Sequence, residues 1–501
     1  MIASIRSYRA TSFLMQPLAV GSCQPCQARS VMALMAGAPE PSKPKRPITT
    51  RYPIAAAAVA ALRRRGGIHR APAKATQRVA LHALPSAGTG KALGRIGDTG
   101  WFPADCALAV GKTDLVAAVN GEVAIFNRSG KRLGAETLNA FFGSVRGGLA
   151  AFDPRAVFDP HSERFFVIAV ARSDEGAPRQ SMVLIAVSKT AAARDGFDVY
   201  GLDASEAGGA RLGTLWADFP TLGIDSRGLY IGLNMFPWDK DTFGWARVLA
   251  FRKEDVLRGE FSGGNFSRLK DPDGTASFTI FPCRTFGDPP KQYLVSTQIK
   301  DSGVSRKLVL WTISWDRRGQ PSLDSRAVGV LSYHWPPEGE QPDGSAIDSG
   351  DVRLGDAVCR SGLVHACFTS AQGGRAAVQW VQIDAASGKV RQQGVLGDES
   401  LSLAYPSLQP NEDGTLKLCC TAVGPDLPLS IAVAERQVTD PDGGFGAVRL
   451  AVAGKGSQQE KGQRWGDYTG MAADPADPKT CLAHAPLNRS GKLWETRVIR
   501  V

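Results

Sequence analysis

Seven polar residues stand at the openings of short apolar runs that recur along this chain of 501 residues. They are Asp153, Arg155, Asp218, Arg353, Tyr405, Arg464 and Asp467. If they meet in space, their carboxylates, guanidinium groups and phenol could bind a sugar, a small zwitterion or a cation. They also have a structural interpretation, because Asp before Pro or Gly often caps a turn and Arg can satisfy carbonyl groups on neighbouring elements.

No spacing pattern assigns a catalytic role to these or to other residues. The Gly-x-Ser-x-Gly turn of many serine hydrolases does not occur, and the six histidines lack a paired metal-ligand spacing such as His-x-x-x-His. We therefore predict no metal site and no cofactor.

The repeated sequence motif that contains the seven residues is clearest over residues 217–234. Asp218 and Pro220 open an apolar run, residues 225–228 supply a turn with a glycine, and a second apolar run follows. This order predicts a β-hairpin. Further copies are centred near residues 103, 154, 356, 406 and 467, and a weaker copy covers 284–297.

The repeat predicts an all-β fold, a β-propeller of seven four-stranded blades over residues 98–501. The spacing between neighbouring copies is close to the roughly 40 to 50 residues that are typical of propeller blades, or somewhat larger. Intervening β-rich runs such as 181–187 and 307–313 supply the other strands, and no helical periodicity competes with them. We expect the C-terminal run 494–501 to close the ring by pairing in the first or last blade.

In a propeller the innermost strand of each blade lines the central channel, so the seven polar residues should meet at one mouth. We call them the axial cluster. We predict that Asp153, Asp218 and Asp467 lie at the same end of the channel. Arg155 or Arg464 should pair with at least one of them, because unpaired buried carboxylates are costly.

Charge separates the first 97 residues from the rest. The formal net charge is +11, but residues 1–97 hold 15 basic side chains and one acid, so the remainder holds 44 basic against 47 acidic groups. Segment 1–97 is therefore predicted to be a disordered basic targeting or linker segment. The near-neutral propeller lacks a basic groove in its sequence, which argues against nucleic-acid binding.

Three interpretations of the N-terminus remain open. Arg6, Arg9 and the apolar residues up to Cys23 resemble an export signal with a lipoprotein-type cysteine, which would place a lipid anchor at Cys23. The acid-poor composition also fits an organelle transit peptide, and translation could instead start at Met32 or Met35. No apolar run approaches the roughly 20 residues of a membrane-spanning helix.

Cys359 and Cys367 fall on paired strands of one predicted hairpin, so they are either a disulfide in an oxidising compartment or two buried thiols. Cys419 and Cys420 are adjacent in a predicted strand and should point to opposite faces.

Residues 98–501 resemble a group of largely uncharacterised exported β-propeller proteins with a sialidase-like fold. The resemblance rests on Ala118-Val119-Asn120, on residues 153–159 and 218–225, and on Arg464-Trp465-Gly466-Asp467-Tyr468. It implies export and a propeller fold. Sialidase activity does not carry over, because the Ser-x-Asp-x-Gly-x-Thr-Trp turns of that family are absent and no motif assigns its catalytic residues.

We therefore expect a monomeric, exported recognition module that binds a glycan, another small polar ligand or a partner protein at the axial mouth. The alternative is a glycoside hydrolase of sialidase type. It predicts turnover of an aryl glycoside that is lost when Asp467 or Tyr405 is replaced.

Overall fold

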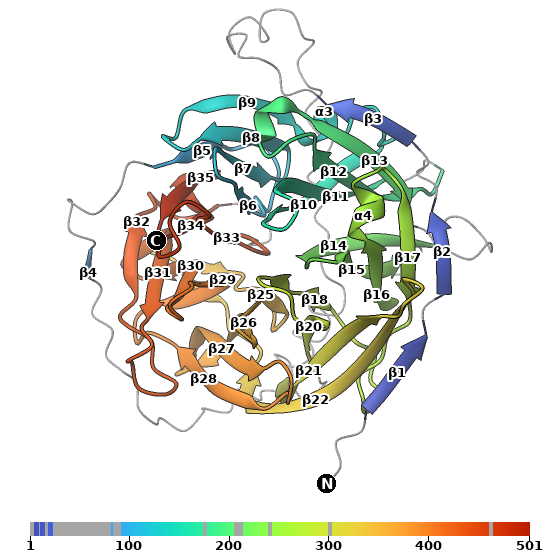
Figure 1. Cartoon of the computed structure of the whole chain (residues 1–501). Helices are drawn as coiled ribbons and strands as arrows, with labels where there is room; N and C mark the ends of the chain where they lie inside the picture. Colours follow the sequence, from blue (N-terminus) through green and yellow to red (C-terminus); the bar gives the residue numbers. More distant parts are fainter. Residues whose placement is uncertain are drawn as a thin grey trace, which may run out of the picture.

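The computed structural model is an all-β propeller. Its antiparallel sheets are arranged around a central axis (Figure 1). It describes residues 5–9, 11–15, 19–23, 82–83, 92–173, 178–204, 214–238, 243–298, 303–459 and 464–501. From residue 107 onward the chain forms successive antiparallel strand sets, and the first strand of each set lies nearest the axis (Figure 1).

The first three sets follow one another directly along the chain. The first set is β6 (Ala107–Val110), β7 (Asp114–Val119), β8 (Glu122–Asn127) and β9 (Arg132–Thr137). The second set is β10 (Ala150–Asp159), β11 (Arg164–Arg172), β12 (Ser181–Ser188) and β13 (Phe197–Asp203). The third set is β14 (Leu215–Ile224), β15 (Gly228–Pro237), β16 (Trp245–Arg252) and β17 (Phe261–Phe266).

The later sets continue the same plan. The next set is β18 (Phe281–Pro282), β20 (Gln292–Thr297), β21 (Val304–Trp315) and β22 (Pro321–His334). It is followed by β25 (Leu354–Arg360), β26 (Leu363–Gln372), β27 (Arg375–Asp384) and β28 (Val390–Leu396). Then come β29 (Ser402–Pro410), β30 (Leu416–Gly424), β31 (Leu427–Arg436) and β32 (Arg449–Val452). The last set is β33 (Gly470–Ala473), β34 (Cys481–Ser490), β35 (Leu493–Arg500) and β5 (Gly94–Gly97).

Short elements connect or extend these sets. They are β19 (Arg284–Thr285), β23 (Gly339–Glu340), β24 (Ala346–Ile347), the helices α3 (Leu138–Phe141) and α4 (Lys253–Val256), and a 3₁₀ turn over Ala193–Asp195. No helix in the described part of the chain has the length and apolar character needed to cross a bilayer.

The prediction of seven separate four-stranded blades is wrong, because in the described part of the chain only five sheets are separate blades, each of four or five strands. The two-residue strand β19 pairs in parallel with both β14 and β25, which joins their two sets into one ten-stranded sheet. Several sheets also carry an extra outer strand from the N-terminal segment. A two-residue parallel strand near the axis has no periodic signal in the sequence, so repeat spacing alone could not reveal this junction.

The N-terminal segment is also partly different from the prediction. β5 pairs with β35, so residues 94–97 belong to the propeller and not to the segment before it. β1 (Ile5–Arg9), β2 (Thr11–Met15) and β3 (Ala19–Cys23) pair with the outer strands β22, β17 and β13, and β4 (His82–Ala83) pairs with β32. The predicted anchor at the Cys23 side chain, and most of segment 1–97, lie outside the described residues.

The core lies between neighbouring sheets because most inner and second strands bury both faces. Every residue of β14 and of β30 is buried. Cys420 packs with Trp380 and Leu408 in one cluster, whereas Cys419 packs with Ile431 in another, which confirms that the two cysteines face opposite sides of β30.

The cysteines between residues 106 and 481 are free thiols, and all of them are buried. In the hairpin of β25 and β26, Cys359 lies opposite Val364 and Cys367 lies opposite Asp356. Because they are not cross-strand partners, the disulfide alternative for Cys359 and Cys367 is wrong and the two-thiol alternative holds.

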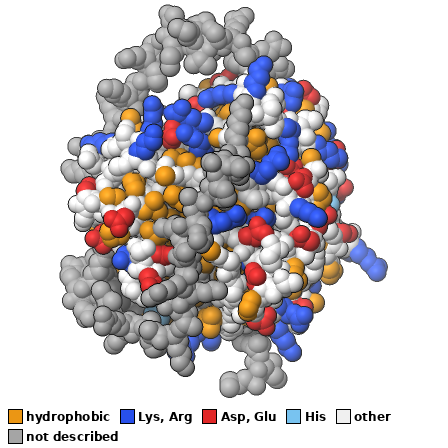
Figure 2. All heavy atoms as spheres, turned by 90° about the vertical axis from the view of Figure 1, so that its left-hand side faces the viewer, with side chains coloured by type: hydrophobic (Ala, Val, Ile, Leu, Met, Phe, Trp, Pro, Cys, Tyr) orange, Lys and Arg blue, Asp and Glu red, His pale blue; other side chains and the backbone are white. Residues whose placement is uncertain are grey.

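Charges on the molecular surface are mixed. On the face in Figure 2, Lys and Arg side chains alternate with Asp and Glu, and the visible described residues do not gather into one basic patch. This distribution fits the near-neutral balance of residues 98–501.

Candidate functional site

A left-handed backbone kink recurs in the inner strands, either within the first half of the strand or two residues before it. Asp105, Asp153, Phe219, Thr279 and Tyr405 have φ of 50°, 54°, 47°, 46° and 55°. Such values are unusual for residues other than glycine and turn the chain sharply. The pairing register shifts at the kinks of β10, β14 and β29. The backbone N–H groups there consequently need partners outside the normal ladder.

Side chains of the preceding strand set accept these N–H groups. Asn120 Oδ1 accepts the Asp153 N–H at 2.7 Å, and Asn234 Oδ1 accepts the Thr279 N–H at 2.9 Å. Thr369 Oγ1 accepts the Tyr405 N–H at 3.0 Å. Sequence reasoning missed these positioning residues. Their signal was the asparagine that closes the second apolar run in two copies of the repeat, at 120 and 234.

Two carboxylates link neighbouring sets in the same way. Asp153 Oδ2 accepts the Phe219 N–H at 3.2 Å, and Asp105 Oδ1 accepts the Asp467 N–H at 2.9 Å. The other oxygen of Asp105 accepts from Asn120 Nδ2 at 2.8 Å. Asp105 was not among the predicted residues, yet it is fully buried and joins the last strand set to the first.

The structure brings the predicted aspartates together at one end of the axis. The charges of Asp218 and Asp467 act on Asp153, and that of Asp467 acts on Asp218. Arg464 Nη2 donates to Asp467 Oδ2 at 2.5 Å. The predicted common mouth for Asp153, Asp218 and Asp467, with an arginine paired to one of them, is therefore confirmed.

Burial dominates the titration of this cluster. Desolvation, reinforced by Asp218 and Asp467, raises the pKa of Asp153 well above its usual range, and Arg464 and Arg155 only partly oppose this. Desolvation and Asp467 raise the pKa of Asp218 to about 6. The pKa of Asp105 is raised for the same reasons. Burial and mutual repulsion thus favour the protonated carboxyl over the carboxylate at this mouth.

Two arginines of the axial cluster are packed inside it. The Arg155 guanidinium lies 3.3 Å from the ring centroid of Tyr468, and its Nε donates to the Pro220 carbonyl at 2.9 Å. Its Nη2 atom is buried without a hydrogen-bond partner. Arg353 pairs side-on with Asp351, with Nε 2.7 Å from Oδ1, and also lies over the ring of Phe219.

Tyr405 is held as a neutral phenol. Its hydroxyl donates to the Asp348 carbonyl at 2.8 Å, and the side chain is buried. Desolvation and the nearby carboxylates Asp348 and Asp467 raise the pKa of Tyr405 well above its usual value. The arrangement therefore opposes formation of the phenolate that a tyrosine nucleophile requires.

Arg464 and Asp467 are the accessible part of the axial cluster. Their side chains are 13% and 10% exposed, whereas Asp153, Asp218, Arg353 and Tyr405 are more deeply buried. This mouth thus combines the Arg464–Asp467 pair with the more deeply buried carboxyl groups of Asp105, Asp153 and Asp218.

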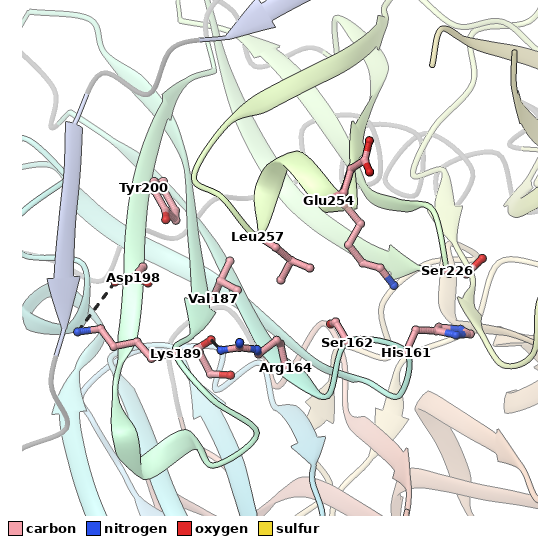
Figure 3. A pocket seen from close by; sticks show the side chains of 12 residues that line it. His161, Ser162, Arg164, Val187, Lys189, Asp198, Tyr200, Ser226, Glu254 and Leu257 are labelled. Carbon is pink, nitrogen blue, oxygen red and sulfur yellow. Dashed lines mark hydrogen bonds and ion pairs between the residues drawn. The ribbon is translucent and has the colours of Figure 1, made fainter. Parts of the chain in front are cut away.

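Two cavities lie away from this cluster, and none of its residues lines either of them. The larger one, of about 580 Å³, lies between the second and third strand sets (Figure 3). Lys189 and Asp198 face each other at one end, 4.0 Å apart, with Arg164 beside Lys189. The smaller cavity, of about 290 Å³, is lined by residues near the C-terminal ends of the inner strands.

Among the residues that the structure describes, no group of three or more His, Cys, Asp or Glu side chains is arranged to hold a metal ion. The carboxylates of the axial cluster instead bind backbone N–H groups and arginines.

No protein-family model and no curated protein matches the chain. Among solved structures, it is similar to a mutant of the NanB sialidase from Streptococcus pneumoniae, with 8% identity, a TM-score of 0.37, and coverage of 78% of this chain and 81% of that chain. It is also similar to a thermostable family-43 glycoside hydrolase, with 11% identity, a TM-score of 0.29, and coverage of 71% and 90%. The Dos1 propeller is a third, with 6% identity, a TM-score of 0.38, and coverage of 79% and 78%. The neighbours are thus sialidase-like and other β-propeller proteins, and values this low carry no argument about activity.

Proposed function

We propose that this chain is a recognition module that binds a glycan or another small polar ligand at the mouth formed by the axial cluster. The observation that carries the proposal is the partly exposed Arg464–Asp467 pair above buried carboxylates. Such a pair offers a guanidinium donor and a carboxylate acceptor to sugar hydroxyls or to an ammonium group.

Several features favour binding over catalysis. Tyr405 is a neutral phenol bonded to a carbonyl, and Arg353 is already paired with Asp351. Tyr405 and Arg353 thus fix the shape of the mouth, and the residues at its rim remain for contact with a ligand. A preorganised polar rim of this kind suits recognition, because little side-chain freedom is lost on binding.

Replacement of Asp467 by Asn tests the proposal. The change keeps the size of the side chain and removes the charge that pairs with Arg464. We expect Asp467→Asn to remain folded, with its glycan-array signal reduced at least about tenfold, because a charge-assisted hydrogen bond contributes about 1.5–3 kcal/mol.

Glu260→Gln serves as the matched control, because Glu260 is 60% exposed and is not part of the axial cluster. Its binding should equal that of the parent protein. A purely structural role for Asp467 predicts a different outcome: no array signal for the parent, together with a loss of about 1–3 kcal/mol of stability in Asp467→Asn.

A glycoside hydrolase is the second candidate, and Asp218 is the observation that favours it. Burial and the Asp467 charge raise its pKa to about 6, and a raised carboxyl pKa is a property that a general acid requires. A panel of aryl glycosides distinguishes the two proposals. Turnover above buffer that Asp218→Asn abolishes would favour the hydrolase, whereas array binding without turnover would favour the recognition module.

A further inference from the structure

The cavity of about 290 Å³, which we call the channel cavity, lies at the opposite end of the axis from the axial cluster. Its lining comes from the ends of β6, β10, β14, β25, β29 and β33, and from β19. Asp153, by contrast, lies in the first half of β10, four residues before Val157 of the cavity lining. At about 3.3 Å per residue, the two sites are separated by roughly 13 Å along the strand.

The walls of the channel cavity are predominantly apolar. They include Leu108, Val110, Phe158, Ile224, Phe286 and Ala473. Phe158 and Phe286 are only partly buried; Phe158 packs on the ring of Phe165, and the guanidinium of Arg360 lies over the ring of Phe286. Accessible aromatic rings in a concave site provide contact area for another apolar group.

Arg284 lines the cavity, and its positive charge is already paired with Asp356. Arg284 Nη1 donates to the Met471 carbonyl at 2.6 Å, and Nη2 lies 2.8 Å from Asp356 Oδ2. Nη2 also reaches the carbonyl of Leu408 and the amide oxygen of Gln409. Arg284 thus connects β19 with three other inner strands, and its charge is paired with Asp356, although its Nε atom is buried without a hydrogen-bond partner.

The charged groups at the rim are also paired. Lys112 bonds to Glu163, Arg360 lies 2.9 Å from Glu412, and the Asp474 carboxylate is bonded to Arg128. A ligand with a net charge would have to break one of these pairs or remain without a counter-charge. The cavity therefore complements an uncharged molecule.

We propose that the channel cavity binds a small, neutral aromatic molecule of about the size of an indole ring. Its volume is at the lower end of the roughly 300–1,000 Å³ of ligand pockets, too small for an oligosaccharide. This site is independent of the function proposed for the axial cluster, because the two share no residue.

Indole is the probe, and indole-3-acetate is its charged counterpart. We expect saturable binding of indole in calorimetric titration and in saturation-transfer NMR, with indole-3-acetate at least about tenfold weaker because no free cation awaits its carboxylate. Absence of saturable indole binding, or tighter binding of the acetate, would overturn the proposal.

Tryptophan substitutions at two alanine positions locate the site. Ala473→Trp fills the cavity and should weaken indole binding at least tenfold. Ala476→Trp adds the same ring to an exposed position that does not line the cavity, and should leave binding unchanged. If Ala473→Trp does not fold, Phe286→Ala should weaken indole binding about fivefold by removing one wall. Unchanged binding in a folded cavity variant would contradict the assignment.

Discussion

Burial decides the chemistry of Asp218 at the scale of a single residue. Its pKa is about 6 in the folded chain, against an ordinary value of 3.8, because desolvation and the Asp467 charge disfavour the carboxylate. The folded state therefore binds more protons than the unfolded state between these two pH values. The stabilising contribution is complete below about pH 4 and is lost as the pH rises through about 6.

Replacing Asp218 by Asn removes this contribution, because the amide cannot ionise, and it also removes a charge that raises the pKa of Asp153. We predict similar stabilities of variant and parent near pH 4, and a variant more stable by about 2–3 kcal/mol near pH 8. Urea unfolding of both proteins across this range measures the difference. His365 and His484, whose pKa values burial lowers to about 4, act equally on both proteins. Parallel curves for variant and parent would refute the assigned shift.

At the scale of the element, the kinked inner strand depends on acceptors from the preceding strand set. Asn120 serves three partners: the Asp153 N–H, the Asp105 carboxylate and the Pro103 carbonyl. Thr369 supports the equivalent kink at Tyr405 with a single accepted hydrogen bond. A buried group that loses its partner costs about 1–3 kcal/mol, so the two positions should differ in importance.

We predict that Asn120→Ala lowers the free energy of unfolding by about 3 kcal/mol or more, and that the near-isosteric Thr369→Val lowers it by about 1–2 kcal/mol. Denaturant midpoints at constant m-value measure both changes. Equal costs, or costs below about 0.5 kcal/mol at both positions, would show that ordered water can replace these acceptors.

At the scale of the whole molecule, the ends of the propeller meet in one sheet. The expected pairing of the C-terminal run in the last blade is confirmed, because β35 pairs with β34. On its other side β35 pairs with β5, which comes from the N-terminal side of the first strand set. Trp494 and Val498 of β35 are each 1% exposed, so this strand also contributes to the core.

Deleting residues 494–501 should therefore lower the melting temperature on the order of 10 °C. The deletion removes several buried side chains, Trp494 and Val498 among them, and it leaves β5 without its antiparallel partner and β34 with β33 alone. Leu493→Ser is the control, since this residue of the same strand is 46% exposed and its replacement should have little effect. A truncated chain that melts with the parent would contradict closure by β35.

The sequence alone determined the all-β architecture, and it also determined that the polar residues of the axial cluster lie at one end of the axis. Both follow from a repeated pattern: apolar alternation specifies strands, and equivalent positions in repeated hairpins face one axis. Asp153, Asp218 and Asp467 could be grouped for this reason, although Asp105 and Asp351 could not, because they precede their strands without a shared motif.

Only the tertiary structure decided what these residues do to one another. The kinks at Asp153 and Tyr405, their acceptors Asn120 and Thr369, and the junction through β19 depend on partners that lie far apart in the chain. The channel cavity likewise arises where seven segments converge. Hydrogen-bond satisfaction and packing across such separations leave no periodic trace in the sequence, so they become visible only when the strands are assembled.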